Sequence, residues 1–146
     1  MPPTIRPWPL TRKGGKDFPV RSLQHLLNGH ASAIKVDGAF GDKTDEAVRA
    51  LQKAEELGVD GIVGPKTWPK LIVLVRKGSE GDAVRALQDA FKARADEPRE
   101  DLKVDGIFGD KTETAVRGFQ EALEARVDGI AGPVTWQALM SGTLLD

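Results

Sequence analysis

The chain has 146 residues, 40% of them apolar and 29% charged, which is the balance of a folded globular protein rather than a disordered one. Its formal net charge of −1, with cations spread along the chain, excludes a basic surface for nucleic acid or for a membrane. The absence of cysteine excludes disulfide bridges, a thiol nucleophile and a cysteine-ligated zinc site.

One motif organises the sequence: Val-Asp-Gly-x-x-Gly occurs four times, each time directly before a helical pattern. The four copies begin at Val36, Val59, Val104 and Val127. The aspartate can accept hydrogen bonds from its own turn, and the glycine can take the positive φ that a tight turn needs. Each copy therefore predicts a tight turn that leads into a helix.

The repetition divides the chain into two halves. Val84 lies 64 positions after Val20, and Val104 lies 68 positions after Val36, so the second half is longer between its first helix and its first turn. Each half carries three helical patterns with a Val-Asp-Gly turn before the second and the third. We therefore predict an all-α protein made of two tandem three-helix domains.

Residues 1–9 contain four of the nine prolines, which indicates an extended N-terminal arm. Its one large apolar side chain, Trp8, is expected to anchor the arm to the first domain, and an exposed ring that stacks on a ligand is the alternative. A first helix follows in each half. Pro19 is expected at the first helical position of one, and Asp82 at the N-cap of the other.

The second helix of each half is expected to begin near Asp42 or Asp110 and to be the longest, with acidic residues in its first turn. A further turn leads to the third helix, whose first position is expected at Pro65 or Pro133. Matching tryptophans on the two third helices are expected in the core. They are Trp68 and Trp136.

Residues 71–75, Leu-Ile-Val-Leu-Val, join the halves without glycine, serine or proline. An apolar join of this kind favours burial, so the two domains are expected to pack against each other rather than swing freely. We place the N-terminal arm at residues 1–9, the first domain at 10–73 and the second domain at 74–146.

The sequence shows no catalytic, metal-binding or cofactor motif. His25 and His30 are five residues apart and are expected to face solvent, no HExxH pattern is present, and no nucleophile-elbow motif surrounds a serine. The turn aspartates could be calcium ligands or paired glycosidase acids, but each stands alone before its glycine and all four are equivalent, which favours a structural role. These aspartates are Asp37, Asp60, Asp105 and Asp128.

Four glutamines follow an apolar helix residue at repeated positions. The expected role of each side-chain amide is to bond the backbone of the neighbouring turn, and a polar floor for a sugar or peptide groove is the alternative. They are Gln24, Gln52, Gln88 and Gln120.

The order of motifs resembles the peptidoglycan-binding domain family, a small three-helix module found beside bacterial cell-wall hydrolases. The motifs are Val-Arg-x-Leu-Gln, then Val-Asp-Gly-x-Phe-Gly-x-x-Thr-x-x-Ala-Val-Arg, then Val-Asp-Gly-Ile-x-Gly-Pro-x-Thr-Trp-x-x-Leu. The resemblance occurs twice, over residues 10–71 and 74–140. Asp42 and Asp110 depart from it by standing where the family commonly has proline, and Leu51 stands where an aromatic residue is usual.

This resemblance implies non-catalytic binding of bacterial cell-wall peptidoglycan, by its glycan strand or its stem peptide, with avidity from two modules or targeting of an associated cell-wall hydrolase. The alternative is a protein-interaction scaffold or adaptor of a wall-associated or phage-like assembly. We expect an extracellular or cell-wall location, reached by a route that the sequence leaves open. We also expect no enzyme activity, no cofactor, no metal, no nucleic-acid partner, no membrane insertion and a monomer.

We place the ligand in a shallow groove beside the first turn of each half and the start of its second helix, where backbone amides would meet stem-peptide carboxylates. The lining residues of this hypothesis are Asp37, Phe40, Asp42, Thr44 and Arg49 in the first half, and Asp105, Phe108, Asp110, Thr112 and Arg117 in the second. The other two turns, which end in Gly-Pro-x-Thr-Trp, are interpreted as purely structural.

Overall fold

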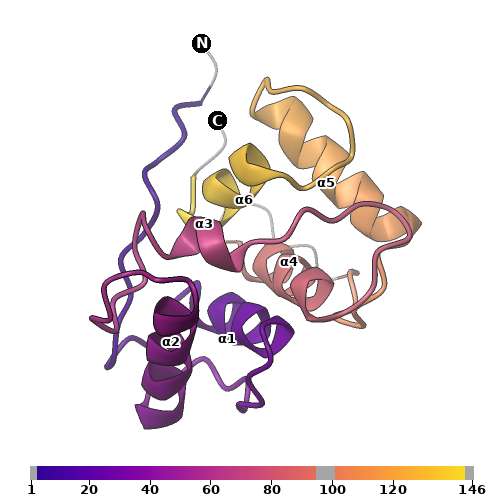
Figure 1. Cartoon of the computed structure of the whole chain (residues 1–146). Coiled ribbons are helices and arrows are strands. Elements are labelled where there is room, and N and C mark those ends of the chain that lie inside the picture. Colours follow the sequence, from indigo (N-terminus) through magenta and orange to yellow (C-terminus); the bar gives the residue numbers. More distant parts are fainter. Residues whose placement is uncertain (1–2, 95–100, 144–146) are drawn as a thin grey trace.

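The computed structural model describes residues 3–94 and 101–143, and these ranges contain six α-helices (Figure 1). The helices are α1 (Val20–Gly29), α2 (Asp42–Ala54) and α3 (Trp68–Leu71) in the first half, and α4 (Asp82–Ala93), α5 (Asp110–Ala122) and α6 (Pro133–Met140) in the second. Within the described ranges the extended segments form only isolated backbone bridges. The all-α prediction, with three helices in each half, is therefore confirmed. As predicted, α2 and α5 are the longest helices, with 13 residues each.

Three helices begin directly after the second glycine of a Val-Asp-Gly-x-x-Gly turn. Gly41, Gly109 and Gly132 are the N-cap residues of α2, α5 and α6, and all three have extended backbone. Pro133 occupies the first helical position, as predicted. The motif therefore ends where its helix starts.

Three other predicted helix starts are wrong. Pro19 is the N-cap residue of α1 rather than its first residue. Asp82 is the first residue of α4, because Gly81, with a φ of 120°, takes the N-cap position. Pro65 lies before α3 in a turn in which two successive backbone N–H groups donate to the Gly64 carbonyl. This turn delays the third helix and shortens it to four residues.

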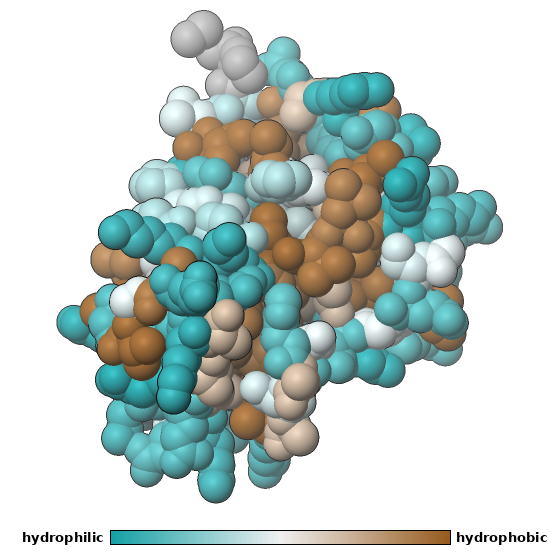
Figure 2. All heavy atoms as spheres, viewed as in Figure 1, coloured by the Kyte–Doolittle hydropathy of each residue, from teal (hydrophilic) through white to brown (hydrophobic). Residues whose placement is uncertain are grey.

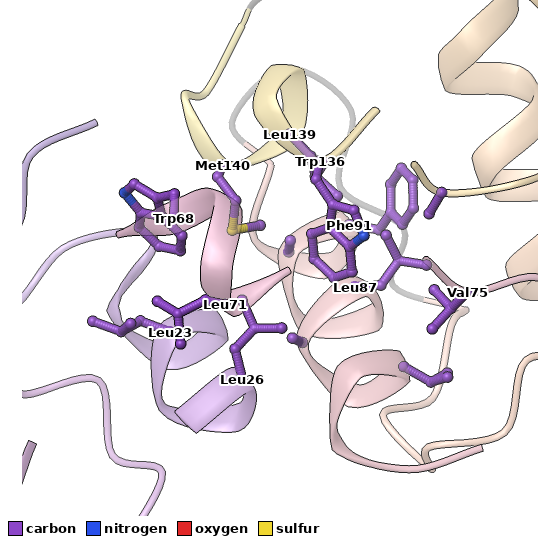
Figure 3. Close-up of a cluster of buried hydrophobic side chains, with 14 of the residues drawn as sticks. Leu23, Leu26, Trp68, Leu71, Val75, Leu87, Phe91, Trp136, Leu139 and Met140 are labelled. Atoms are coloured by element: carbon purple, nitrogen blue, oxygen red, sulfur yellow. The ribbon is translucent and has the colours of Figure 1, made fainter. Parts of the chain in front are cut away.

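The two halves share one hydrophobic core. α1 packs against α4, and Figure 3 shows Trp68 and Leu71 on one side of Met140 and Trp136 and Leu87 on the other. Each of these five side chains is at most 1% exposed. The packing of the halves and the core position of both tryptophans are thus confirmed. Sharing a core stabilises both halves, because a unit of about 65 residues alone buries too little surface to be very stable.

The apolar join at residues 71–75 is buried only at its ends. Leu71 and Val75 lie in the core, whereas Val73 and Leu74 are 43% and 55% exposed. Figure 2 shows a hydrophobic ridge on this face, where the segment runs in Figure 1. The prediction that the whole join is buried is wrong. Its backbone is held by the bridge between Val75 and Ala131 and by the Trp136 indole N–H, which donates to the Val73 carbonyl, and these bonds leave the Val73 and Leu74 side chains at the surface.

The N-terminal arm contacts both halves. Trp8 stacks on Trp68 with ring centroids 6.0 Å apart, as predicted, and the Trp68 indole N–H donates to the Pro9 carbonyl at 2.8 Å. The arm also reaches the second half, where the Arg6 backbone N–H donates to Thr143 Oγ1 at 3.0 Å. The arm therefore ties the two halves together, whereas the sequence predicted an anchor on the first domain only.

Equivalent positions of the two halves meet where α1 packs on α4. His25 Nε2 lies 3.0 Å from Asp89 Oδ2, and Arg21 Nε donates to the same oxygen at 3.1 Å. His25 is only 7% exposed, and His30 is half-buried with its Nε2 2.9 Å from the Leu71 carbonyl oxygen. The prediction that both histidines face solvent is therefore wrong. Helical periodicity does not show that another helix covers this face of α1.

We expect this contact to make the protein less stable in acid. Burial raises the pKa of Asp89, but the hydrogen bond with His25 and the charge of Arg21 outweigh burial and lower that pKa below its usual value. The stabilisation is therefore complete above the unfolded-state pKa of about 3.9 and is lost as the pH falls through the lower folded-state pKa. Asp89→Asn should remove this part of the acid sensitivity in urea unfolding measured from about pH 7 to about pH 2.5. Equal acid sensitivity in both proteins would contradict the assignment.

Candidate ligand-binding site

Each Val-Asp-Gly turn is held by a glutamine of the preceding helix. In the first turn, Gln24 Nε2 lies 3.0–3.1 Å from Asp37 Oδ1, the Ala39 carbonyl and Thr44 Oγ1. Gln24 Oε1 accepts hydrogen bonds from the backbone N–H groups of Asp37 and Gly38 at 3.0 and 2.9 Å. One amide therefore joins a helix, a turn and the start of the next helix.

The same arrangement recurs at the other three turns. In each, a glutamine amide bonds the turn aspartate, the carbonyl two residues later and the threonine near the start of the next helix. The sets are Gln52 with Asp60, Ile62 and Thr67; Gln88 with Asp105, Ile107 and Thr112; and Gln120 with Asp128, Ile130 and Thr135. The prediction that the glutamines tie helices to turns is confirmed.

The turn aspartates also have the structural role predicted for them. The Ile62 backbone N–H donates to Asp60 Oδ1 at 2.9 Å, and the other three turns repeat this bond at 2.9–3.0 Å. In all four aspartates this backbone hydrogen bond contributes most to lowering the carboxyl pKa below its usual value. The hydrogen bond from the glutamine amide lowers the pKa further. The following glycine has a φ between 74° and 77° in every turn, a region that favours glycine. The four carboxylates are thus bound to their own turns.

An arginine three residues before each glutamine lies over the glycine of the same turn. A Cβ added to Gly61 would lie 2.8 Å from Arg49 Nη2, so the arginine covers the open side of that glycine. This role of the arginine was not predicted from the sequence, although the repeated Arg-x-x-Gln spacing places both side chains on one helix face. The four pairs are Arg21 with Gly38, Arg49 with Gly61, Arg85 with Gly106 and Arg117 with Gly129.

Four of the ten predicted ligand contacts are core residues. Phe40 and Phe108 are 2% and 1% exposed, and Thr44 and Thr112 are 3% and 2% exposed. The two threonine hydroxyls bond the glutamines of their turns at 3.1 and 3.0 Å. These four side chains offer no surface to a ligand in this structure, so the prediction that they line the groove is wrong. Phenylalanine and threonine at these positions complete the core behind the turn.

The two predicted arginines lie at the second turn of each half rather than at the first. Arg49 Nη2 is 3.4 Å from the Asp60 carbonyl, and Arg117 Nη2 is 3.5 Å from the Asp128 carbonyl. Both side chains leave the middle of the second helix and reach towards the turn that follows it. The structure therefore does not bring them together with the other predicted groove residues, which belong to the turn before that helix.

The remaining four predicted residues are the exposed aspartates Asp37, Asp42, Asp105 and Asp110. Two of them form ion pairs at the start of the second helix of their half: Asp42 with Lys13, and Asp110 with Lys77 at 2.6 Å. Bonding to the lysine lowers the pKa of both aspartates. Each start of a second helix thus carries charges of both signs at the surface.

A cavity of about 310 Å³ opens beside the first turn of the second half. Its lining includes Asp105, Ile107, Asp110 and Lys111, so it lies where the sequence predicted a groove. In the first half, the turn of Asp37 instead lines a cavity of about 230 Å³ that α4 also lines. The cavity at the first turn of the first half is therefore lined by both halves, and the cavity at the first turn of the second half by residues of that half.

The described ranges contain neither a membrane-crossing helix nor a metal-binding cluster. No helix in residues 3–94 and 101–143 is long and apolar enough to cross a membrane. The same residues bring together no group of three or more histidine, cysteine, aspartate or glutamate side chains placed to hold a metal ion.

Comparison with known proteins gives a family and several relatives. The family model described as "Putative peptidoglycan binding domain" matches residues 18–71 and 80–139. A Bacillus licheniformis protein named "Probable N-acetylmuramoyl-L-alanine amidase" is 32% identical over 158 residues, which cover 90% of this chain and 45% of that protein. The zinc D-Ala-D-Ala carboxypeptidase of Streptomyces albus G is 33% identical over 121 residues, which cover 83% of this chain and 44% of that enzyme.

A solved structure is also similar. The crystal structure of a peptidoglycan-binding protein from Clostridioides difficile is 40% identical, with a TM-score of 0.42, and the match covers 43% of this chain and 40% of that one. The chain spans less than half the length of both curated relatives named above. The two family matches fall one in each half and together cover more than half of the sequence. The chain therefore belongs to the peptidoglycan-binding domain family and carries two tandem copies of the domain.

Proposed function

We propose that the chain binds bacterial cell-wall peptidoglycan through its two modules and does not cleave it. Membership of both halves in the family supports binding. The relatives named as an amidase and a carboxypeptidase are matched over less than half of their length, which fits a binding part of a larger hydrolase. Targeting of a hydrolase, and a cell-wall or extracellular location, are parts of the same proposal.

The observation that carries the proposal is the cavity of about 310 Å³ beside the first turn of the second half. Ile107, which is 53% exposed, lies there beside the charged groups of Asp105, Asp110 and Lys111. A stem peptide combines apolar side chains with carboxylates, and a lysine beside an apolar wall matches both features. Binding by a monomer with one module in each half would gain avidity if both modules engage one polymer.

The test is co-sedimentation of the protein with purified, insoluble peptidoglycan sacculi. We expect the protein in the pellet with sacculi and in the supernatant with cellulose, which shares insolubility but not the peptide or the acetamido groups. A protein that stays in the supernatant with sacculi at every salt concentration would contradict binding. Capture of a protein partner under those conditions would instead favour the adaptor function.

The same incubation tests for catalysis. We expect no soluble fragments and no new reducing ends, because the proposed contacts hold the polymer without a nucleophile or an activated water. Fragments released in proportion to protein concentration and time would show that the chain is an enzyme.

A further inference from the structure

Phe18 is the only exposed side chain among the eight aromatic residues of the chain. It is 39% exposed, whereas six of the others are buried and Trp8 is half-buried against Trp68. One exposed apolar side chain is common at protein surfaces and by itself indicates no ligand. Its surroundings are what distinguish Phe18.

Phe18 lines the cavity of about 230 Å³ between the first turn and α4. The charged residues that line the same cavity are Lys16, Asp17, Arg21, Asp37 and Asp89, so one aromatic ring shares it with two cationic groups and three carboxylates. The cavity is smaller than the roughly 300–1,000 Å³ of pockets that enclose drug-sized ligands. Its size suits a single ring with a short substituent rather than a long segment of polymer.

Two polar side chains of this cavity, those of Arg21 and Asp37, are fixed by hydrogen bonds. The Arg21 guanidinium donates to Asp89 of α4 at 3.1 Å and to the Val36 carbonyl at 3.2 Å. Asp37 Oδ1 accepts from Gln24 Nε2 and from a backbone N–H of its own turn, each at 3.0 Å. These bonds hold both side chains in place before a ligand arrives, which reduces the entropy lost on binding.

We propose that this cavity is a subsite for one N-acetylhexosamine residue of a glycan strand, an inference that rests on the peptidoglycan binding proposed above. A sugar ring has a face of C–H groups and an edge of hydroxyl groups. Phe18 provides a flat apolar surface for the face, Asp37 accepts a hydrogen bond from a hydroxyl, and Arg21 donates to the acetamido carbonyl. A stem peptide has no ring face that would use Phe18 in this way.

The second half does not repeat the aromatic residue of this subsite. The position equivalent to Phe18, 64 residues later, is Asp82, whose carboxylate accepts a hydrogen bond from Arg85 at 2.8 Å. The second half thus has an ion pair where the first half has an aromatic ring. We therefore expect one glycan subsite per chain, although the family domain is present twice.

The test is an NMR titration of the full chain with the soluble trimer of N-acetylglucosamine. We expect one trimer per chain and shifted backbone amide signals at Phe18, Arg21 and Gly38. Phe18→Ala should weaken binding about tenfold, equivalent to about 1.4 kcal/mol. Phe18→Leu should weaken it similarly because it keeps an apolar side chain but loses the ring face, whereas Phe18→Tyr should stay within about twofold of the original chain.

Val134→Ala is the matched control, because Val134 is an apolar side chain of the second half that is 55% exposed. Its affinity for the trimer should be unchanged, and urea unfolding should show that each variant is folded. If the original chain sediments with sacculi but Phe18→Ala binds the trimer equally well, the subsite is wrong and peptidoglycan binding stands. A chain that neither sediments with sacculi nor binds the trimer overturns both proposals.

Discussion

Gln52→Leu is expected to lower the free energy of unfolding by about 3 kcal/mol. Gln52 is fully buried, and its amide makes five hydrogen-bond contacts, in two of which Oε1 accepts from the backbone N–H groups of Asp60 and Gly61. Leucine has a similar volume, so the loss comes from polar groups left without a partner rather than from a cavity. The buried group left without a partner is the Gly61 N–H, because the Thr67 hydroxyl keeps its hydrogen bond to the Ile62 carbonyl at 3.4 Å. Such an unpaired buried group costs about 1–3 kcal/mol.

Urea unfolding followed by circular dichroism measures this loss. Lys53→Ala on the same helix is the control, since Lys53 is exposed and its replacement should change stability by no more than about 0.5 kcal/mol. A loss below about 1 kcal/mol for Gln52→Leu would show that the turn is held by its own backbone and that the glutamine contributes little.

Trp136→Ala is expected to cost about 4 kcal/mol, because truncating a buried aromatic side chain removes its packing and leaves a cavity. Trp136 is fully buried, and its indole N–H donates to the Val73 carbonyl of the segment that joins α3 to α4 at 2.9 Å. The ring also lies in the core that both halves share (Figure 3). The substitution should therefore destabilise the first half as well as the second.

Trp8→Ala provides the comparison. Trp8 is half-buried and stacks on Trp68, so its removal should cost only about 1 kcal/mol. Both variants should unfold in one transition in urea, because a shared core couples the halves. Two separate transitions in Trp136→Ala would show that each half folds on its own and would contradict a common core.

Sequence patterns predicted the local structure well where the deciding contacts are near in the chain. The Asp60 turn is one example, since its aspartate bonds an N–H two residues later and its glutamine lies eight residues earlier. The same patterns predicted the site less well. Phe40, Asp42 and Thr44 lie within five residues of one another at the first turn, and only the packed structure shows that Phe40 and Thr44 are buried and Asp42 is exposed.

The sequence by itself determined the two-fold repeat, the helices and the four turns, because helical periodicity and aspartate–glycine turn chemistry act over a few residues. Only the tertiary structure decided which faces of the helices meet. The packing of α1 on α4 places His25 against Asp89 and brings Arg21 and Phe18 to one cavity with the first turn. These contacts join residues up to about 70 positions apart, and they depend on how two amphipathic faces pack, which no local pattern encodes.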